Sequence, residues 1–421
     1  MKKTIIYMCA CAMSGLMLAT SCQDSMDLQT ANSNTRAVVI DKDLFAVRGR
    51  INVKLEKGAN QALPTSAKGN VEMQSVPSAM SSAMKYAGAY KMERVFKPAS
   101  IYEERTIAEG LDRWYTIYFD ESKDVAEVLQ QFNKAAGVEY AERVLPIARP
   151  KFTAKPYTGP APQTRNQPTA SAFNDPLLAK QWHYYNDGSV SPHAEKGADC
   201  NLKPVWEKYT TGKSNVIVAI VDGGIDVTHE DLVDNLYINE KEKNGQAGVD
   251  DDGNGFVDDV YGYNFVEAKD VVGGKIEPYN EGHGTHVAGT VGARNNNGIG
   301  VAGVAGGNGA ADSGVRLMSC QIFRKKNEQG DAAAAIKYAA DNGAVICQNS
   351  WGYSSNTGVT SMPQLLKDAV DYFIKNAGCD ANGQQRADSP MKGGVVIFAA
   401  GNENKEFSAY PACYPPAVSV A

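Results

Sequence analysis

The sequence predicts an α/β protein whose larger part is a mostly parallel sheet covered by helices on both faces, preceded by a small α+β domain. Short, almost fully apolar runs recur in the second half at residues 216–221, 315–323, 345–347 and 395–400. Such runs are typical of strands that are buried on both faces. Helical spacing of apolar residues lies between them, at 284–294, 332–342 and 362–376. Strands that alternate with helices indicate a parallel sheet.

Composition agrees with a soluble globular protein of two or three domains. The chain has 421 residues, of which 43% are hydrophobic and 21% charged, and these values exclude a wholly disordered, collagen-like or multi-span membrane protein. Lys and Arg number 42 against 48 Asp and Glu, a net charge of -6. Nucleic acid is therefore not an expected partner, because binding to phosphate backbones needs a basic excess. Eight cysteines are too few for a disulfide scaffold in so long a chain.

The first 21 residues predict a secretory signal. Lys2 and Lys3 precede an apolar run at 5–19, and small residues then lead to Cys22. The arrangement resembles a bacterial lipoprotein signal. The resemblance implies that Cys22 becomes the lipid-bearing first residue, and that the protein is anchored in the bacterial envelope, at the outer membrane, the cell surface or in the periplasm. The alternative is ordinary cleavage and secretion, with Cys22 as an unpaired thiol.

The rest of the chain divides by composition into four parts. Residues 22–40 are rich in Ser, Thr, Asn and Asp and predict a flexible tether. Residues 41–150 predict the small α+β domain, with a strand at 111–120, a helix at 122–136 and an extended run at 138–147. Residues 151–173 are rich in proline and predict an exposed linker open to proteolytic nicking. Residues 174–421 form the predicted α/β domain.

Polar residues follow the predicted strands of this domain. Asp222 comes directly after the strand at 216–221, and Asn402 follows the strand at 395–400. His283 stands where a helix is expected to begin. Side chains at the carboxyl ends of parallel strands share one edge of the sheet. An Asp and a His at one edge suit proton transfer, because the carboxylate fixes the imidazole tautomer and stabilises the imidazolium. Each residue alone is also common as a turn residue or helix cap.

The order of the motifs removes much of this ambiguity. The string Val218-Ala219-Ile220-Val221-Asp222-Gly223-Gly224 is followed by GHGTHVAGT at 282–290, by Asn349-Ser350-Trp351-Gly352 and by Ala399-Ala400-Gly401-Asn402. In order and style this resembles the subtilisin-like serine peptidase family (subtilases, peptidase family S8) over residues 174–421. The resemblance implies a three-layer α/β/α fold and polypeptide substrates. It also implies that the domain at 41–150 is a propeptide that assists folding and inhibits the active site.

The resemblance also assigns roles to single residues. Asp222 matches the catalytic Asp of the family, His283 its general base and Asn402 its oxyanion-hole donor. Ser350, Trp351 and Gly352 match the segment that pairs with the substrate backbone and lines the pocket before the scissile bond.

The nucleophile of the family has no counterpart in these residues. Subtilases carry it in a Gly-Thr-Ser-Met/Ala segment, and no Gly-Thr-Ser occurs in the 421 residues. We therefore expect the chain to be inactive alone and the nucleophilic serine of a serine endopeptidase to lie beyond Ala421. The alternative is a non-catalytic envelope protein that binds peptides or a partner without cleaving them.

A further motif predicts a structural calcium ion. Oxygen-bearing side chains occupy positions 1, 3, 5 and 9 of an EF-hand-like loop, with glycine at position 6 and a backbone carbonyl expected at position 7. The predicted ligands are Asp250, Asp252, Asn254, the carbonyl of Phe256, and Asp258. Position 12 is Tyr261, so the usual bidentate Glu is absent. The resemblance to subtilases favours Ca²⁺, and the alternative is an acidic turn without an ion.

Overall fold

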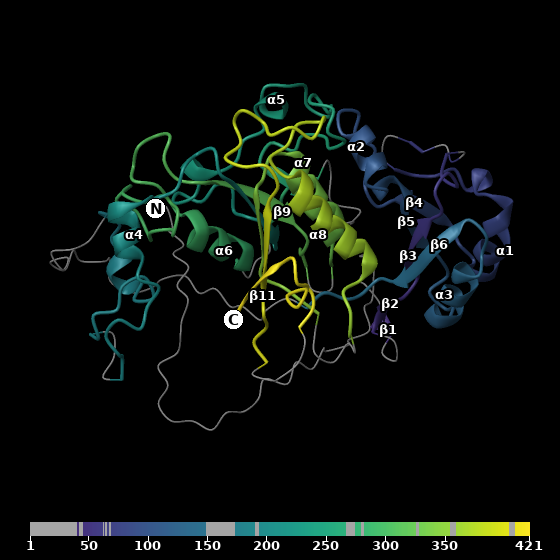
Figure 1. Ribbon diagram of the computed structural model, residues 1–421, viewed down its shortest axis with the longest axis horizontal. Coiled ribbons are helices and arrows are strands. Elements are labelled where there is room, and N and C mark those ends of the chain that lie inside the picture. Colours follow the sequence, from purple (N-terminus) through teal and green to yellow (C-terminus); the bar gives the residue numbers. More distant parts are fainter. Residues whose placement is uncertain are drawn as a thin grey trace.

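A computed structural model gives the fold of the chain (Figure 1). The structure describes residues 40–41, 45–61, 63, 65–66, 69–148, 173–189, 193–266, 274–278, 282–325, 328–353, 359–403 and 409–421. The predicted signal, Cys22, nearly all of the tether and nearly all of the linker lie outside these residues. No helix within the described ranges has both the length and the apolar character needed to cross a bilayer.

Residues 45–148, here called the N-terminal unit, are built on a four-stranded antiparallel sheet of order β4-β5-β3-β6. Its strands are β3 (Arg50–Leu55), β4 (Lys91–Arg94), β5 (Trp114–Tyr118) and β6 (Val138–Arg143). Its helices are α1 (Ser78–Ala87), α2 (Glu103–Ala108) and α3 (Val125–Asn133). The predicted strand, helix and strand correspond to β5, α3 and β6. A short ribbon of β1 (Ile40–Asp41) and β2 (Ala46–Val47) precedes them.

Helix α3 shows how the local sequence determines an element of this unit. The Asp124 side chain accepts a hydrogen bond from the backbone N–H of Glu127 at 2.9 Å and so caps the first turn. Val125, Val128 and Phe132 are buried and lie on one face of the helix. This face packs into the core of the N-terminal unit together with β3 and β5.

Residues 173–421, here called the C-terminal unit, contain a six-stranded sheet of order β12-β11-β10-β7-β9-β8 in which every neighbouring pair is parallel. The strands are β7 (Ile217–Asp222), β8 (Gly262–Asn264), β9 (Arg316–Gln321), β10 (Ile346–Asn349), β11 (Val395–Ala399) and β12 (Val418–Val420). The helices are α4 (Leu202–Lys208), α5 (Glu240–Lys243), α6 (His283–Gly292), α7 (Ala332–Asp341) and α8 (Gln364–Asn376). Four single-turn 3₁₀ helices complete the described elements, at Met73–Ser75, Leu111–Arg113, Leu178–Lys180 and Val233–Asn235.

Helices cover both faces of this sheet, and the alternation of side chains along β7 shows the two layers. Val218 and Ile220 share a buried cluster with Ala288 of α6. Ala219 and Val221 point to the other face, into a cluster that contains the apolar residues of α7 and α8. The predicted α/β fold with a mostly parallel sheet and helices on both faces is confirmed.

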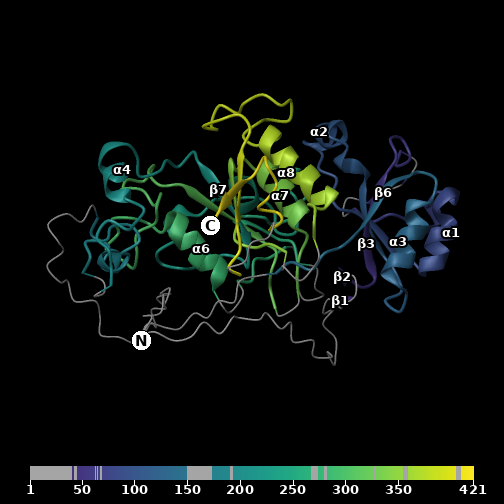
Figure 2. The same cartoon turned by 60° about the horizontal axis from the view of Figure 1, so that its bottom comes forward.

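The N-terminal unit packs against the outer side of α7 and α8 (Figures 1 and 2). Val95, Phe96, Leu111 and Trp114 of this unit belong to the same buried cluster as α7, α8 and the sheet. One apolar core therefore spans both units. Helix α8 lies in this core between the N-terminal unit and the sheet that carries the site.

Candidate active site

The carboxyl ends of three adjacent strands form the edge that carries the predicted site. Asn349 of β10 pairs with Val221 of β7 and with Phe398 of β11. The residues that follow these three are Asp222, Ser350 and Ala399, so they stand at one level of the sheet. Asn402 follows three residues after the last of them.

Asp222 and His283 meet at this edge. The Nδ1 atom of His283 lies 2.8 Å from Oδ1 of Asp222. Asp222 is 2% exposed, and its Oδ1 also accepts from the N–H of Gly223 at 2.6 Å. The His283 side chain keeps 19% of its surface exposed. Because an ionised carboxylate can only accept, the contact favours the imidazole tautomer with its proton on Nδ1. Such an imidazole can take a proton at Nε2.

Oδ2 of Asp222 is buried and has no hydrogen-bond partner in the described structure. A buried carboxylate that lacks a full set of donors gains most from an adjacent positive charge. The geometry therefore favours His283 as the group on which that charge develops.

Helix α6 begins at His283 because the chain turns sharply at Gly282, whose φ of 72° lies in the left-handed region. The next residue, Gly284, packs against the loop that follows β7. A Cβ atom at position 284 would lie 2.5 Å from the carbonyl oxygen of Gly224. This close approach of backbone to backbone brings the first residue of α6 to the carboxylate of Asp222.

The Ser350-Trp351-Gly352 segment lies beside β10 and is already paired with another part of the chain. Ala148 and Gly352 form an antiparallel bridge, in which Ala148 N donates to Gly352 O at 2.8 Å and Gly352 N donates to Ala148 O at 3.3 Å. Trp351 is buried against the edge of Phe398, and the Ser350 hydroxyl accepts from Gln348. Gly352 therefore offers both backbone hydrogen-bonding groups to an extended peptide.

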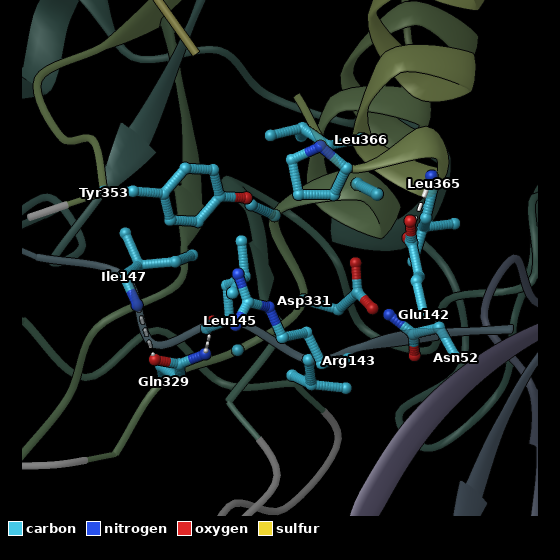
Figure 3. A pocket seen from close by; sticks show the side chains of 15 residues that line it. Asn52, Glu142, Arg143, Leu145, Ile147, Gln329, Asp331, Tyr353, Leu365 and Leu366 are labelled. Carbon is cyan, nitrogen blue, oxygen red and sulfur yellow. Dashed lines mark hydrogen bonds between the residues drawn. The ribbon is translucent and has the colours of Figure 1, made fainter. Parts of the chain in front are cut away.

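The Gln329 side chain holds the backbone of the segment that leads to Ala148. The Gln329 side chain accepts from Ile147 N at 3.0 Å and donates to Leu145 O at 3.1 Å. Figure 3 shows these two bonds in a pocket that Leu145 and Ile147 share with Tyr353. The sequence did not predict that residues 145–148, here called the tail, would pair with Gly352, nor a role for Gln329. A glutamine after a predicted strand carries no local signal for such a contact.

Asn402 stands on the same edge in the loop after β11. Its backbone N–H donates to the Glu403 carboxylate at 2.9 Å, and the residue is exposed. The structure thus places Asn402 on the edge where the sequence predicted an oxyanion donor, with no described hydrogen bond to Asp222 or His283.

The predicted calcium loop folds around three carboxylates, one of which the sequence did not single out. Ligand oxygens of Glu242, Asp250 and Asp252 lie within 4.8 Å of one another. Burial raises the pKa of both Glu242 and Asp252, and the neighbouring carboxylates add to this effect. Glu242 belongs to α5, eight residues before the motif begins, and a helical Glu outside the loop gives no signal of its own.

Asn254 and Asp258, the other side chains of the predicted calcium-binding set, make hydrogen bonds around this cluster. The Asn254 side-chain oxygen accepts from Phe256 N at 2.8 Å. The Asp258 carboxylate accepts from Gly248 N at 3.0 Å. The structure therefore brings Asp250 and Asp252 together with Glu242. The Asn254 side-chain amide donates to Asp252 and, outside the loop, to Asn342, and the N–H of Asp258 donates to Glu242.

Comparison with known proteins identifies the class to which this site belongs. Residues 213–421 match the model of the subtilase family. Subtilisin-like protease 1 of Plasmodium falciparum is 34% identical over 167 residues, which cover 38% of this chain and 22% of that protein. Fervidolysin of Fervidobacterium pennivorans is 30% identical over 229 residues, covering 52% and 24%. Neuroendocrine convertase 2 of Bos taurus is 30% identical over 231 residues, covering 54% and 30%.

Residues 213–421 are thus similar to the subtilase family. The chain spans between about a fifth and a third of the length of these relatives. Among solved structures, fervidolysin aligns with a TM-score of 0.49 at 20% identity, covering 92% of this chain and 46% of that one.

Substitution of two of the three glycines of α6, Gly284 and Gly289, tests the close approach that positions His283. Gly284→Ala forces Cβ against the Gly224 carbonyl and should lower the free energy of unfolding by about 1–3 kcal/mol. Gly289→Ala is the matched control, because a Cβ there meets nothing within 4 Å. It should stabilise the protein by about 0.4–1 kcal/mol. Urea unfolding midpoints measure both, and equal effects of the two substitutions would contradict this explanation.

Proposed function

We propose that His283 is the general base, and Asp222 the carboxylate that orients it, of a subtilase-type serine endopeptidase whose nucleophilic serine is encoded after Ala421. The observation that carries the proposal is the 2.8 Å contact between His283 Nδ1 and Asp222 Oδ1, made by the two family motifs that bear these residues. The backbone of Gly352, which already pairs antiparallel with Ala148, supports a polypeptide substrate.

The residues would act as follows. His283 Nε2 takes the proton of the serine hydroxyl as the serine oxygen bonds to the carbonyl carbon of the scissile peptide. The imidazolium then formed is stabilised by Asp222, and it gives the proton to the leaving amine nitrogen as the C–N bond breaks. Water afterwards hydrolyses the acyl-enzyme by the same route. The side-chain amide of Asn402 would donate to the oxyanion, while Ser350, Trp351 and Gly352 hold the substrate.

The N-terminal unit would act as the inhibitor of this site. Its tail at 145–148 pairs with Gly352 through Ala148 and is held by Gln329, so it uses the backbone groups of Gly352 that a substrate backbone needs. Removal of the tail after cleavage in the linker would free the backbone N–H and C=O of Gly352 for a substrate.

A fluorophosphonate probe tests the peptidase proposal on the full product of the gene. We expect an in-frame Gly-Thr-Ser-Met/Ala segment after the codon for Ala421 and covalent labelling of its serine. Asp222→Asn and His283→Ala should slow labelling by a factor of roughly 10³ or more, because both residues activate the serine. Asp234→Asn, at an exposed position, is the matched control and should label normally.

Two outcomes would contradict the proposal. A stop codon after Ala421 would do so. So would a full-length protein that keeps Asp222 and His283 and does not react. Peptide binding without labelling would instead support the non-catalytic envelope protein.

We also propose a structural Ca²⁺ held by Glu242, Asp250 and Asp252. Three carboxylates whose oxygens lie within 4.8 Å of one another suit a hard cation that prefers oxygen ligands. Asp250 is oriented by the backbone N–H groups of Gly253 and Gly255, at 2.8 and 2.9 Å. A bound cation would offset the repulsion that the crowded carboxylates otherwise feel. Its role would be stability, and no catalytic step involves it.

Chelation tests the calcium proposal. EGTA should lower the melting temperature of calcium-loaded protein, because an ion that binds only the folded state stabilises it in proportion to its binding free energy. Asp250→Asn should weaken calcium binding in titration calorimetry and reduce the effect of EGTA, whereas Asp234→Asn should preserve both. An unchanged melting temperature with EGTA would exclude a structural calcium ion.

A further inference from the structure

Arg105 is a charged residue of the N-terminal unit whose head group is buried in the C-terminal unit. Only 5% of its side-chain surface is exposed. Its Nε donates to the Tyr372 hydroxyl at 2.7 Å and its Nη2 to Asp341 Oδ1 at 2.6 Å. Its Nη1 donates to the carbonyl oxygens of Asp380 at 2.7 Å and Cys379 at 3.3 Å. The described hydrogen bonds of this guanidinium therefore all reach acceptors in the C-terminal unit.

The acceptors form a socket that is organised without Arg105. Asp341 Oδ2 lies 2.5 Å from Lys337 Nζ, one turn earlier on α7, and its Oδ1 accepts from the Tyr372 hydroxyl. The carboxylate is thus already paired within the C-terminal unit. Loss of Arg105 would not leave an isolated buried charge there, so the socket can persist when the N-terminal unit departs.

The socket suits a guanidinium better than an ammonium. Its acceptors meet three different nitrogens of one planar group, as a rigid fork of donors requires. The Arg105 guanidinium carbon also lies 4.7 Å from the ring centre of Tyr102 and 5.5 Å from that of Tyr372, within the range of cation–π attraction. A lysine could reach only part of this set with its single nitrogen.

The contact of Arg105 with its acceptors is remote from the place where the tail pairs with Gly352. The N-terminal unit makes hydrogen bonds to α8 along one face, at Gln364, Asp368 and Tyr372, which are spaced four residues apart. Figure 3 shows Glu142 at the first turn of α8, where it accepts from the Leu365 N–H. At 1.5 Å rise per residue, Tyr372 lies roughly 12 Å further along the helix than Gln364. Within this continuous interface, Arg105 therefore binds roughly two helical turns away from the Glu142 contact.

We propose that Arg105 is the anchor that keeps the N-terminal unit on the C-terminal unit once the linker is cut, and so determines how strongly the tail at Ala148 blocks the backbone groups of Gly352. The inference rests on the proposed function, in which the tail inhibits a peptidase. A tail that detaches while the anchor holds stays at high effective concentration and rebinds. The socket in the C-terminal unit recognises the guanidinium of Arg105, whereas the Ala148–Gly352 bridge uses only backbone atoms.

Dissociation of the nicked protein tests the proposal without any need for peptidase activity. A recognition site for a specific protease is introduced between residues 160 and 165 of the full chain, which is then cut and diluted, and separation of the two pieces is followed by size-exclusion chromatography. Arg105→Ala and Arg105→Lys should each speed dissociation by roughly 30-fold or more, the factor that corresponds to a loss of about 2 kcal/mol of charge-assisted hydrogen bonds.

Arg113→Lys is the matched control. The Arg113 guanidinium bonds to Glu139 and to the Leu55 carbonyl within its own unit, so this variant should dissociate like the unmodified protein. Urea unfolding of the uncut chains identifies any variant that fails to fold. If both Arg105 variants dissociate as slowly as the unmodified protein, the proposal is overturned. Slow dissociation of Arg105→Lys alone would overturn the requirement for a guanidinium. If the fluorophosphonate probe does not label the full-length protein, the peptidase role is contradicted. The dissociation rates still test the role of Arg105 in that case.

Discussion

The register between β7, β10 and β11 is the constraint on which the site depends. It places Asp222, Ser350 and Ala399 at one level of the sheet, and each strand is held there by side chains packed on both faces. A slip of one residue in β7 would turn Val218 and Ile220 toward α7 and α8 and would move Asp222 off the edge. The two core layers therefore specify the position of the carboxylate as strongly as any contact within the site.

The carboxylate in turn requires a cationic or donating neighbour. Asp222 is almost completely buried and one of its oxygens is unpaired in the described structure, which costs free energy that the fold has to offset. His283 reaches it because α6 begins with small residues that approach the loop after β7 closely. Stability and chemistry are coupled here, since the packing that tolerates the buried charge also sets the geometry for proton transfer.

Much of this arrangement could be predicted from the sequence, because it depends on local patterns. Apolar runs predicted the strands, and the polar residues after these runs predicted which edge of the sheet carries the site. Helix α8 starts at Gln364 rather than at Met362, since Pro363 disfavours helical geometry in the residue before it. The contacts between the two units could not be predicted. Ala148 with Gly352 and Arg105 with Asp341 are more than 200 residues apart in the chain, and no periodicity connects them. Glu242 was missed because a single acidic residue in a helix has no distinguishing pattern.

The tautomer of His283 tests the central claim most directly. With five histidines in the chain, long-range ¹H–¹⁵N NMR of histidine-labelled protein can assign the proton of the neutral His283 ring to one nitrogen. Our account places this proton on Nδ1, facing Asp222, and expects Asp222→Asn to change that preference. A neutral His283 with its proton on Nε2 in the unmodified chain would contradict the assignment of Asp222 and His283 as an acid–base pair.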